Sequence, residues 1–151
     1  ATPDVTYNLG SDYSEVWGYA YVYFQDMYEP YGVYFIELLD SSDTVVTSVF
    51  KPNETYDIFA ETAAADTDAN TGVEATDGTK YHIWWHYTTD GVDADLDVYV
   101  STDTTRGSVD ASISGGAATT DVRKIRLSGG NYNSIHFVKV ILDDSEIGDA
   151  P

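Results

Sequence analysis

The segment Val16-Trp17-Gly18-Tyr19-Ala20-Tyr21-Val22-Tyr23-Phe24 decides the fold of this chain. Its side chains alternate with a period of two, which is typical of a β-strand because successive residues of a strand point to opposite faces of the sheet. One face is aliphatic apart from Phe24 and has the character of a core. The other face is a row of large rings whose polar groups require water or a partner, which predicts that it faces a groove. This row consists of Trp17, Tyr19, Tyr21 and Tyr23.

A second segment, Tyr81-His82-Ile83-Trp84-Trp85-His86-Tyr87, alternates in the same way. One face carries Ile83 and Trp85 with two tyrosines, and the other carries His82, Trp84 and His86. By polarity we expect the histidine face to point outward and Trp85 to be the most deeply buried tryptophan. The length of this segment predicts a central strand.

Short segments of the same kind, separated by turn residues, fill the rest of the chain. No segment has the apolar stripe of a helix, and the Ala-rich stretch Glu61–Asn70 is predicted to be a loop. Antiparallel strands without crossover helices predict an all-β jelly-roll sandwich, formed by residues 1–151 as one domain. The predicted strands are Glu15–Gln25, Gly32–Leu39, Thr44–Phe50, Thr55–Ala60, Thr79–Thr88, Leu96–Ser101, Ser108–Ser114, Val122–Ser128 and Ser134–Leu142.

Composition excludes several classes of function. The 151 residues carry 26 acidic and only 7 basic side chains, a formal net charge of −19, so a nucleic-acid partner is not expected. No apolar run approaches the roughly 20 residues of a membrane helix, and the lack of cysteine removes disulfides and thiol chemistry. The acidic surface has two explanations that the sequence leaves open, adaptation to high salt and calcium binding.

The order of these features resembles the concanavalin-A-like lectin and glucanase superfamily, and specifically its laminin-G-like jelly-roll domains. The resemblance is carried by the opening Glu15-Val16-Trp17-Gly18, by Lys80-Tyr81-His82-Ile83 running to Asp90-Gly91, and by Leu96-Asp97-Val98-Tyr99-Val100. Val122–Leu127 and the closing Phe137–Asp144 complete it. The resemblance implies two stacked antiparallel sheets, one of them concave, that bind glycans or proteins, in some members with calcium at an edge of the sandwich.

Catalytic motifs of that superfamily are not found. Its glucanases use a Glu-x-Asp-x-x-Glu strand, whereas the nearest carboxylate run here is Asp93-Ala94-Asp95-Leu96-Asp97. Its lyases use an Arg-rich strand, a Gln-Ile-His run and a Tyr-Lys-Gly-Tyr run, none of which occurs. We therefore expect a domain that is not an enzyme, with a glycan-cleaving enzyme as a remaining alternative.

Metal binding favours calcium over zinc. His82 and His86 lie on one strand face about 13 Å apart, which is too far to chelate one ion. Acidic turns offer the oxygen ligands that calcium requires. The candidate ligands are Asp66, Asp68 and Asn70 in one stretch and Asp93 and Asp95 in another, with Asp143, Asp144 and Asp149 as a third group.

The aromatic faces of the two marked strands give the functional hypothesis. Sugars stack on Trp and Tyr rings beside polar groups, so we expect a glycan to bind at Trp17, Tyr19, Tyr21, Tyr23, Trp84 and His86. The leading function is a non-catalytic, lectin-like recognition domain at a cell or virion surface, to which the sequon Asn53-Glu54-Thr55 adds a hint of an extracellular setting. The alternatives are an interface with neighbouring subunits of a phage, viral or cell-surface assembly, and rings that only stabilise the sheet.

Overall fold

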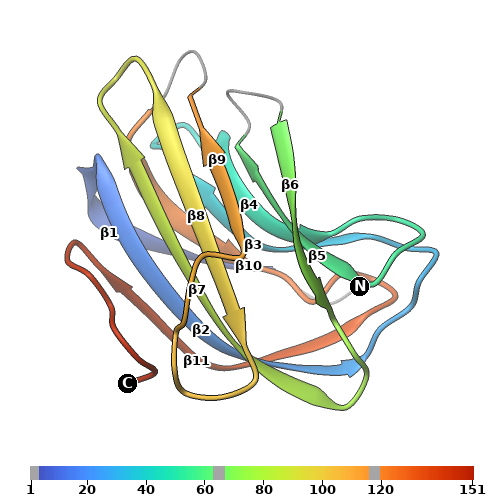
Figure 1. Ribbon diagram of the computed structural model, residues 1–151. Coiled ribbons are helices and arrows are strands. Elements are labelled where there is room, and N and C mark those ends of the chain that lie inside the picture. Colours follow the sequence, from blue (N-terminus) through green and yellow to red (C-terminus); the bar gives the residue numbers. More distant parts are fainter. Residues whose placement is uncertain (1–3, 63–66, 116–119) are drawn as a thin grey trace.

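The protein is a sandwich of two antiparallel sheets (Figure 1). The computed structural model describes residues 4–62, 67–115 and 120–151, and these form strands and no helix, so none of them provides a helix that could cross a membrane. Sheet A contains, in spatial order, β1 (Val5–Tyr13), β10 (Val122–Leu127), β3 (Val33–Leu39), β4 (Val45–Lys51), β5 (Asp57–Thr62) and β6 (Thr67–Glu74). Sheet B contains β11 (Ser134–Asp143), β2 (Glu15–Asp26), β7 (Thr79–Thr89), β8 (Ala94–Ser101) and β9 (Ala111–Ser114). The all-β prediction is confirmed, and β7 is the central strand of its sheet.

The main core lies between the sheets and contains the aliphatic face of β2 as predicted. Val22 and Phe24 are fully buried there, in one cluster with Ile83 and Trp85 of β7. Gly18 is required for this packing, because a Cβ at this position would run into the indole ring of Trp85. The pairing of these two strands therefore depends on one residue that has no side chain.

Two strands were not predicted, and both lie at the edges of sheet A. β1 is almost entirely exposed, and β6 occupies part of the stretch Glu61–Asn70 that was predicted to be a loop. That prediction is wrong, because β5 continues to Thr62 and β6 begins at Thr67. Edge strands such as these are held by main-chain hydrogen bonds to one neighbour, so their side chains carry little of the alternation that marks a buried strand.

Candidate functional site

The six predicted glycan-binding residues do lie together on one surface, the outer face of sheet B. β2 and β7 are hydrogen-bonded neighbours, and their register places Trp17 opposite His86 and Tyr19 opposite Trp84. Tyr21 and Tyr23 continue the row toward the other end of β2. The two aromatic faces therefore lie on neighbouring strands, as a common site for these residues requires.

The exposure of these rings was predicted wrongly. Trp84 is 0% exposed, Tyr19 2% and Trp17 7%, so all three are as buried as core residues. Together with Tyr99 and Ile147 they form a second hydrophobic cluster on the outer face of sheet B. Trp85, expected to be the deepest tryptophan, is 1% exposed and thus no deeper than Trp84. The aromatic ladder, as we call the rings on the outer face of β2 and β7, is thus a small core of its own. Its buried end, formed by Trp17, Tyr19 and Trp84, offers no open surface to a sugar.

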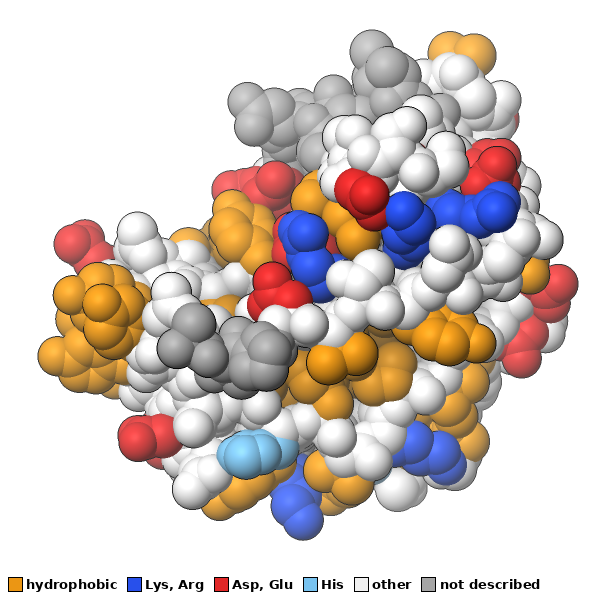
Figure 2. All heavy atoms as spheres, turned by 180° about the vertical axis from the view of Figure 1, so that it is seen from behind, with side chains coloured by type: hydrophobic (Ala, Val, Ile, Leu, Met, Phe, Trp, Pro, Cys, Tyr) orange, Lys and Arg blue, Asp and Glu red, His pale blue; other side chains and the backbone are white. Residues whose placement is uncertain are grey.

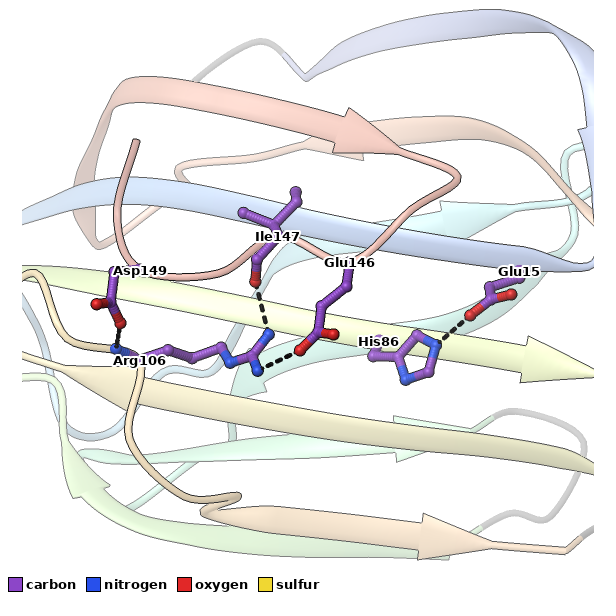
Figure 3. Close-up of polar contacts among 6 residues, drawn as sticks. All are labelled: Glu15, His86, Arg106, Glu146, Ile147 and Asp149. Carbon is purple, nitrogen blue, oxygen red and sulfur yellow. Dashed lines mark hydrogen bonds and ion pairs between the residues drawn. The ribbon is translucent and has the colours of Figure 1, made fainter.

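The second hydrophobic cluster is covered by the C-terminal segment, residues 144–151, and by the loop after β8 (Figure 3). The guanidinium of Arg106 lies over the rings of Trp17 and Tyr99, at 5.0 and 4.9 Å from their centroids. It donates hydrogen bonds to the carbonyl oxygen of Ile147 and to the carboxylate of Glu146, each at 2.6 Å. The backbone N–H of Arg106 also donates to Asp149 at 3.1 Å. Arg106 therefore fastens the C-terminal segment over the aromatic cluster.

The two histidines of β7 have structural partners. His86 stacks on Trp17 with ring centroids 3.9 Å apart, and its Nε2 lies 2.8 Å from Oε1 of Glu15 (Figure 3). His82, predicted to face solvent, is 8% exposed, and its Nδ1 lies 2.7 Å from the hydroxyl of Tyr19. Burial lowers the pKa of His82 below its ordinary value, partly offset by the charge of Asp103. The contact with the Tyr19 hydroxyl joins β7 to β2, so His82 serves the packing of the aromatic rings on this face.

The acidic candidates for calcium do not come together. Asp66 lies outside the described residues, and Asp68 and Asn70 lie on the strand β6, where the amide of Asn70 donates to Asp57 at 2.8 Å. Asp93 and Asp95 flank the start of β8. Within residues 4–62, 67–115 and 120–151, no group of three or more His, Asp or Glu side chains is placed to hold a metal ion. Calcium remains a proposal from composition.

An open groove lies instead on the outer face of sheet A, viewed in Figure 2. Its volume is about 630 Å³, within the usual range for small-molecule sites. Its walls come from β3, β4 and β6 and from the loops that follow Asp26, Lys51 and Leu127. The lining residues are Tyr31, Gly32, Val33, Tyr34, Glu37, Phe50, Lys51, Pro52, Asn53, Asp68, Ser128, Gly130, Asn131 and Tyr132.

The register of sheet A arranges two parallel rows of side chains on this face, of which Tyr34, Phe50, Glu37 and Asp68 line the groove. The aromatic row crosses three strands as Tyr34, Phe50 and Phe59. Tyr34 stacks on Phe50 at 4.7 Å between centroids, and Phe50 lies 5.7 Å from Phe59. The polar row runs parallel to the aromatic row, at the next position on the same face of each strand. It crosses five strands as Arg126, Glu37, Ser48, Glu61 and Asp68. Flat apolar rings thus lie beside hydrogen-bonding groups on β3, β4 and β5.

A stack of three tyrosines forms one rim of the groove. Tyr31 and Tyr132 are parallel with centroids 4.0 Å apart, and Tyr28 stacks on Tyr31 at 5.6 Å. Their exposures are 53% for Tyr28, 43% for Tyr31 and 61% for Tyr132. Three large rings held in one exposed stack contribute little to a core, and such surfaces commonly mark a binding site.

The loop that carries Tyr28 and Tyr31 is anchored to β4 by the buried side chain of Lys51. Lys51 is 0% exposed, and its Nζ donates hydrogen bonds of 2.9 to 3.1 Å to the carbonyl oxygens of Glu29, Tyr31 and Pro52. Burial lowers the pKa of Lys51, with Glu29 opposing the shift. Asn53 and Asn133 add further bonds to the same loop. The tyrosine stack is therefore positioned before any ligand arrives.

Charges around the aromatic row are mostly negative. Arg126 donates to Glu37 from two nitrogen atoms at 2.9 Å, which neutralises that pair. The pKa of Tyr34 is raised, first by burial and then by the charges of Glu61 and Asp68 and a hydrogen bond to Glu61. The phenol of Tyr34 therefore stays protonated and donates its hydrogen to the carboxylate of Glu61.

Sequence reasoning missed this groove because its rings come from separate places. Tyr31 stands in the turn Glu29-Pro30-Tyr31-Gly32 and Tyr132 follows Gly129-Gly130-Asn131, both of which were interpreted only as turns. A tyrosine in a turn has no core into which its ring can pack. The two turn tyrosines were therefore the signal in the sequence that could have indicated an exposed aromatic site. The pairing of Tyr34, Phe50 and Phe59 depends on strand register across β3, β4 and β5, which no single strand encodes.

Comparisons with known proteins show the fold. No family model and no curated protein sequence matches the chain. Among solved structures, the chain is similar to the cellulose-induced protein Cip1, with a TM-score of 0.67, 12% identity and coverage of 95% of this chain and 73% of that one. It is also similar to domains LG4-5 of the mouse laminin α1 chain, with a TM-score of 0.59, 13% identity and coverage of 93% and 39%.

A third similar structure is the exoplasmic/lumenal domain of VIP36 in its Ca²⁺- and mannose-bound form. Its TM-score is 0.57 at 9% identity, with coverage of 97% of this chain and 75% of that one. Alginate lyases, a pentraxin and carbohydrate-binding modules are among the other matches. Identities this low establish the architecture alone, and they confirm the jelly-roll resemblance found in the sequence.

Proposed function

We propose that this chain, a jelly roll of the concanavalin-A-like fold, is a non-catalytic carbohydrate-binding domain whose ligand lies in the groove of sheet A. The observation that carries the proposal is the exposed stack of Tyr28, Tyr31 and Tyr132 at the rim of an open groove. A site that combines apolar walls with a few polar groups suits a sugar, whose ring faces are apolar and whose edges carry hydroxyl groups.

Each part of the groove has a role in this proposal. One sugar ring stacks on a tyrosine at the rim, and a neighbouring ring stacks on the exposed ring of Tyr34, which Phe50 supports from beneath. The polar row supplies hydrogen bonds to the hydroxyl groups along one side of the chain of sugars. The loop held by Lys51 lowers the entropic cost of binding, because the stacking rings are already ordered.

Similar solved structures that are lectins or carbohydrate-binding modules support this reading. They also support the proposal that the domain acts at a cell or virion surface, as one of the similar structures is the CBM2 module of a phage protein. Some similar structures are alginate lyases, so each glycan that binds is also to be assayed for release of new chain ends.

The test is a glycan array followed by calorimetry with the variants Tyr31→Ala and Tyr132→Ala. We expect each variant to lose at least tenfold in affinity, since stacking area is removed, while its melting temperature stays near that of the parent because the rings are exposed. Tyr7→Ala is the matched control, since Tyr7 is 66% exposed and lies outside this groove. Equal affinity of Tyr132→Ala and the parent would overturn the assignment of the site.

A second candidate, packing against a neighbouring subunit, is favoured by one observation. A separate groove of about 610 Å³ lies between β1 and β10 on one side and β11 on the other, and most of its lining side chains are apolar. Apolar residues are exposed beside it, among them Val5, Tyr7 and Val138. Native mass spectrometry tests this candidate: an oligomer that Tyr7→Asp dissociates would support it, and a monomer at all concentrations would contradict it.

A further inference from the structure

Two exposed tyrosines at the rim of the groove lie face to face. The ring of Tyr31, in the loop between β2 and β3, lies 4.0 Å from the ring of Tyr132, in the loop between β10 and β11, measured between centroids. The two ring planes are inclined by only 18°. At this separation the carbon atoms of one ring are in van der Waals contact with those of the other, and solvent reaches both rings.

Buried contacts with the main chain hold this pair together. The side chain of Asn133, the residue after Tyr132, belongs to a residue that is 5% exposed. Its Oδ1 accepts a hydrogen bond from the N–H of Tyr28 at 2.7 Å, and its Nδ2 donates to the carbonyl oxygen of Tyr31 at 3.3 Å. Lys51 donates to the same carbonyl oxygen at 2.9 Å. The stacked arrangement therefore does not depend on the two exposed rings alone.

Stacked phenols are arranged for one particular reaction, oxidative coupling. A phenol that loses an electron and its hydroxyl proton becomes a phenoxyl radical, whose unpaired electron lies partly on the ring carbons ortho to the oxygen. Two such radicals join through ortho carbons, and the new carbon–carbon bond forms perpendicular to the ring planes. Rings that already lie face to face need little movement to react, and this proximity favours coupling within the molecule over coupling between molecules.

We propose that Tyr31 and Tyr132 are a site of oxidative modification, at which hydrogen peroxide and a haem peroxidase join the two rings into dityrosine. One molecule of peroxide takes a hydrogen atom from each hydroxyl group and is reduced to two molecules of water. After the rings join, the hydrogen on each coupled carbon moves as a proton to the oxygen of the same ring, which restores two aromatic phenols. The proposal concerns the tyrosine pair itself and is independent of glycan binding in the groove.

The other exposed tyrosines are less well placed for this reaction. Tyr28 also stacks on Tyr31, but its ring is farther away, at 5.6 Å between centroids. Tyr7 is exposed on the edge strand β1, with no ring stacked on it among the described residues. We therefore expect the link between Tyr31 and Tyr132 to form in preference to other links.

Treatment of the folded protein at micromolar concentration with hydrogen peroxide and a haem peroxidase tests the proposal. We expect a monomer whose mass is lower by two hydrogen atoms and which shows the fluorescence of dityrosine. Trypsin releases residues 127–139 as a peptide whose one tyrosine is Tyr132, so mass spectrometry of the linked peptides and their fragments locates both ends of the link. Because the link closes a loop of roughly 100 residues and so restricts the unfolded chain, the linked protein should also melt at a higher temperature.

Phenylalanine variants keep the ring and remove the hydroxyl group that the reaction requires. Tyr31→Phe and Tyr132→Phe should each lower the yield of the intramolecular link at least fivefold, whereas Tyr28→Phe should lower it less than twofold. Tyr7→Phe is the matched control, because it removes an exposed tyrosine outside this groove, and its yield should equal that of the parent. Circular dichroism before the treatment establishes that each variant is folded.

Three results would overturn the proposal. The first is dityrosine that forms solely between molecules and increases with protein concentration, and the second is an equal intramolecular yield in Tyr132→Phe and Tyr7→Phe. The third is a link between Tyr31 and Tyr132 that forms as readily in urea as in the folded protein, which would mean that the stack does not direct the reaction. None of these measurements involves a glycan, so a failure of the proposed function would leave them unchanged.

Discussion

At the scale of single residues, Trp84 lies fully out of contact with solvent on the outer face of sheet B, packed between Trp17, Tyr19 and Tyr99. We expect Trp84→Ala to lower the free energy of unfolding by about 3–5 kcal/mol, because a large buried ring leaves a cavity. Urea unfolding measures the change, with Tyr132→Ala as the control for loss of an exposed ring. A Trp84→Ala variant as stable as the parent would mean that the second cluster does not form in solution.

The ring of His82 gives the second prediction at this scale. Burial holds the pKa of His82 below 6.5 in the folded protein. As the pH falls below 6.5, the unfolded chain therefore takes up a proton that the folded chain resists, and stability is lost through this window.

Unfolding free energies at pH 7.5 and pH 5.0 measure this effect in the parent, His82→Gln and His136→Gln. The carboxylates titrate in all three proteins, so their contribution cancels in the comparison. We expect the loss of stability on acidification to be smaller in His82→Gln than in the parent, and unchanged in His136→Gln, whose ring is exposed. The same loss in all three proteins would contradict the prediction.

At the scale of elements, several contacts hold the C-terminal segment on sheet B, and most of them involve Arg106. Arg106 bonds to Glu146 and Ile147 and stacks on Trp17, while the N–H of Ala150 donates to the carbonyl of Thr104 at 2.7 Å. We expect Arg106→Ala to cost about 1–3 kcal/mol, since hydrogen bonds of a charged donor are lost, and less at high salt because Glu146 is exposed.

Hydrogen exchange locates that effect. In Arg106→Ala the amides of Ile147 and Ala150 should exchange faster, while those of the central strand β7 stay protected, since opening of the segment is local. Arg123→Ala, which removes a surface pair with Asp12 at 3.3 Å, serves as the control. Uniform acceleration across all strands would indicate that the segment does not open separately.

At the scale of the whole molecule, a net charge of −19 on 151 residues repels itself in the folded state. Raising NaCl from 20 mM to 500 mM should therefore raise the melting temperature, because salt screens repulsion among exposed carboxylates. Scanning calorimetry measures this shift. A melting temperature that is independent of salt would contradict the prediction.

Calcium chloride at matched ionic strength provides the second arm of that experiment. A specific calcium site would raise the melting temperature beyond the shift in NaCl, by mass action on the folded state, and a chelator would reverse the extra rise. The calcium proposal requires this outcome. Equal shifts in the two salts would contradict it and leave the acids as a solvated surface.

Strand alternation was sufficient to predict the all-β class and the strands that build the core. The residues of β2 and β7 specify which faces pack together, because a period of two assigns every side chain to one side of a sheet. The position of Gly18 opposite Trp85 agrees with that assignment, because a Cβ atom at residue 18 would collide with the buried indole ring. The edge strands β1 and β6 were not predicted, because they are held by main-chain hydrogen bonds to a neighbouring strand. Such pairing does not require the alternation of polar and apolar side chains from which strands were predicted.

The sequence by itself determined the two-sheet jelly roll, the central position of β7, and the identity of the main core, because these follow from local patterns of polarity. Tertiary structure decided which aromatic face is open. The ladder of β2 and β7 has the better pattern, yet Arg106 and the C-terminal segment cover its buried end, and both come from distant parts of the chain. The exposed groove of sheet A is assembled from turns and from register across several strands, and long-range pairing of this kind is fixed only when the chain folds.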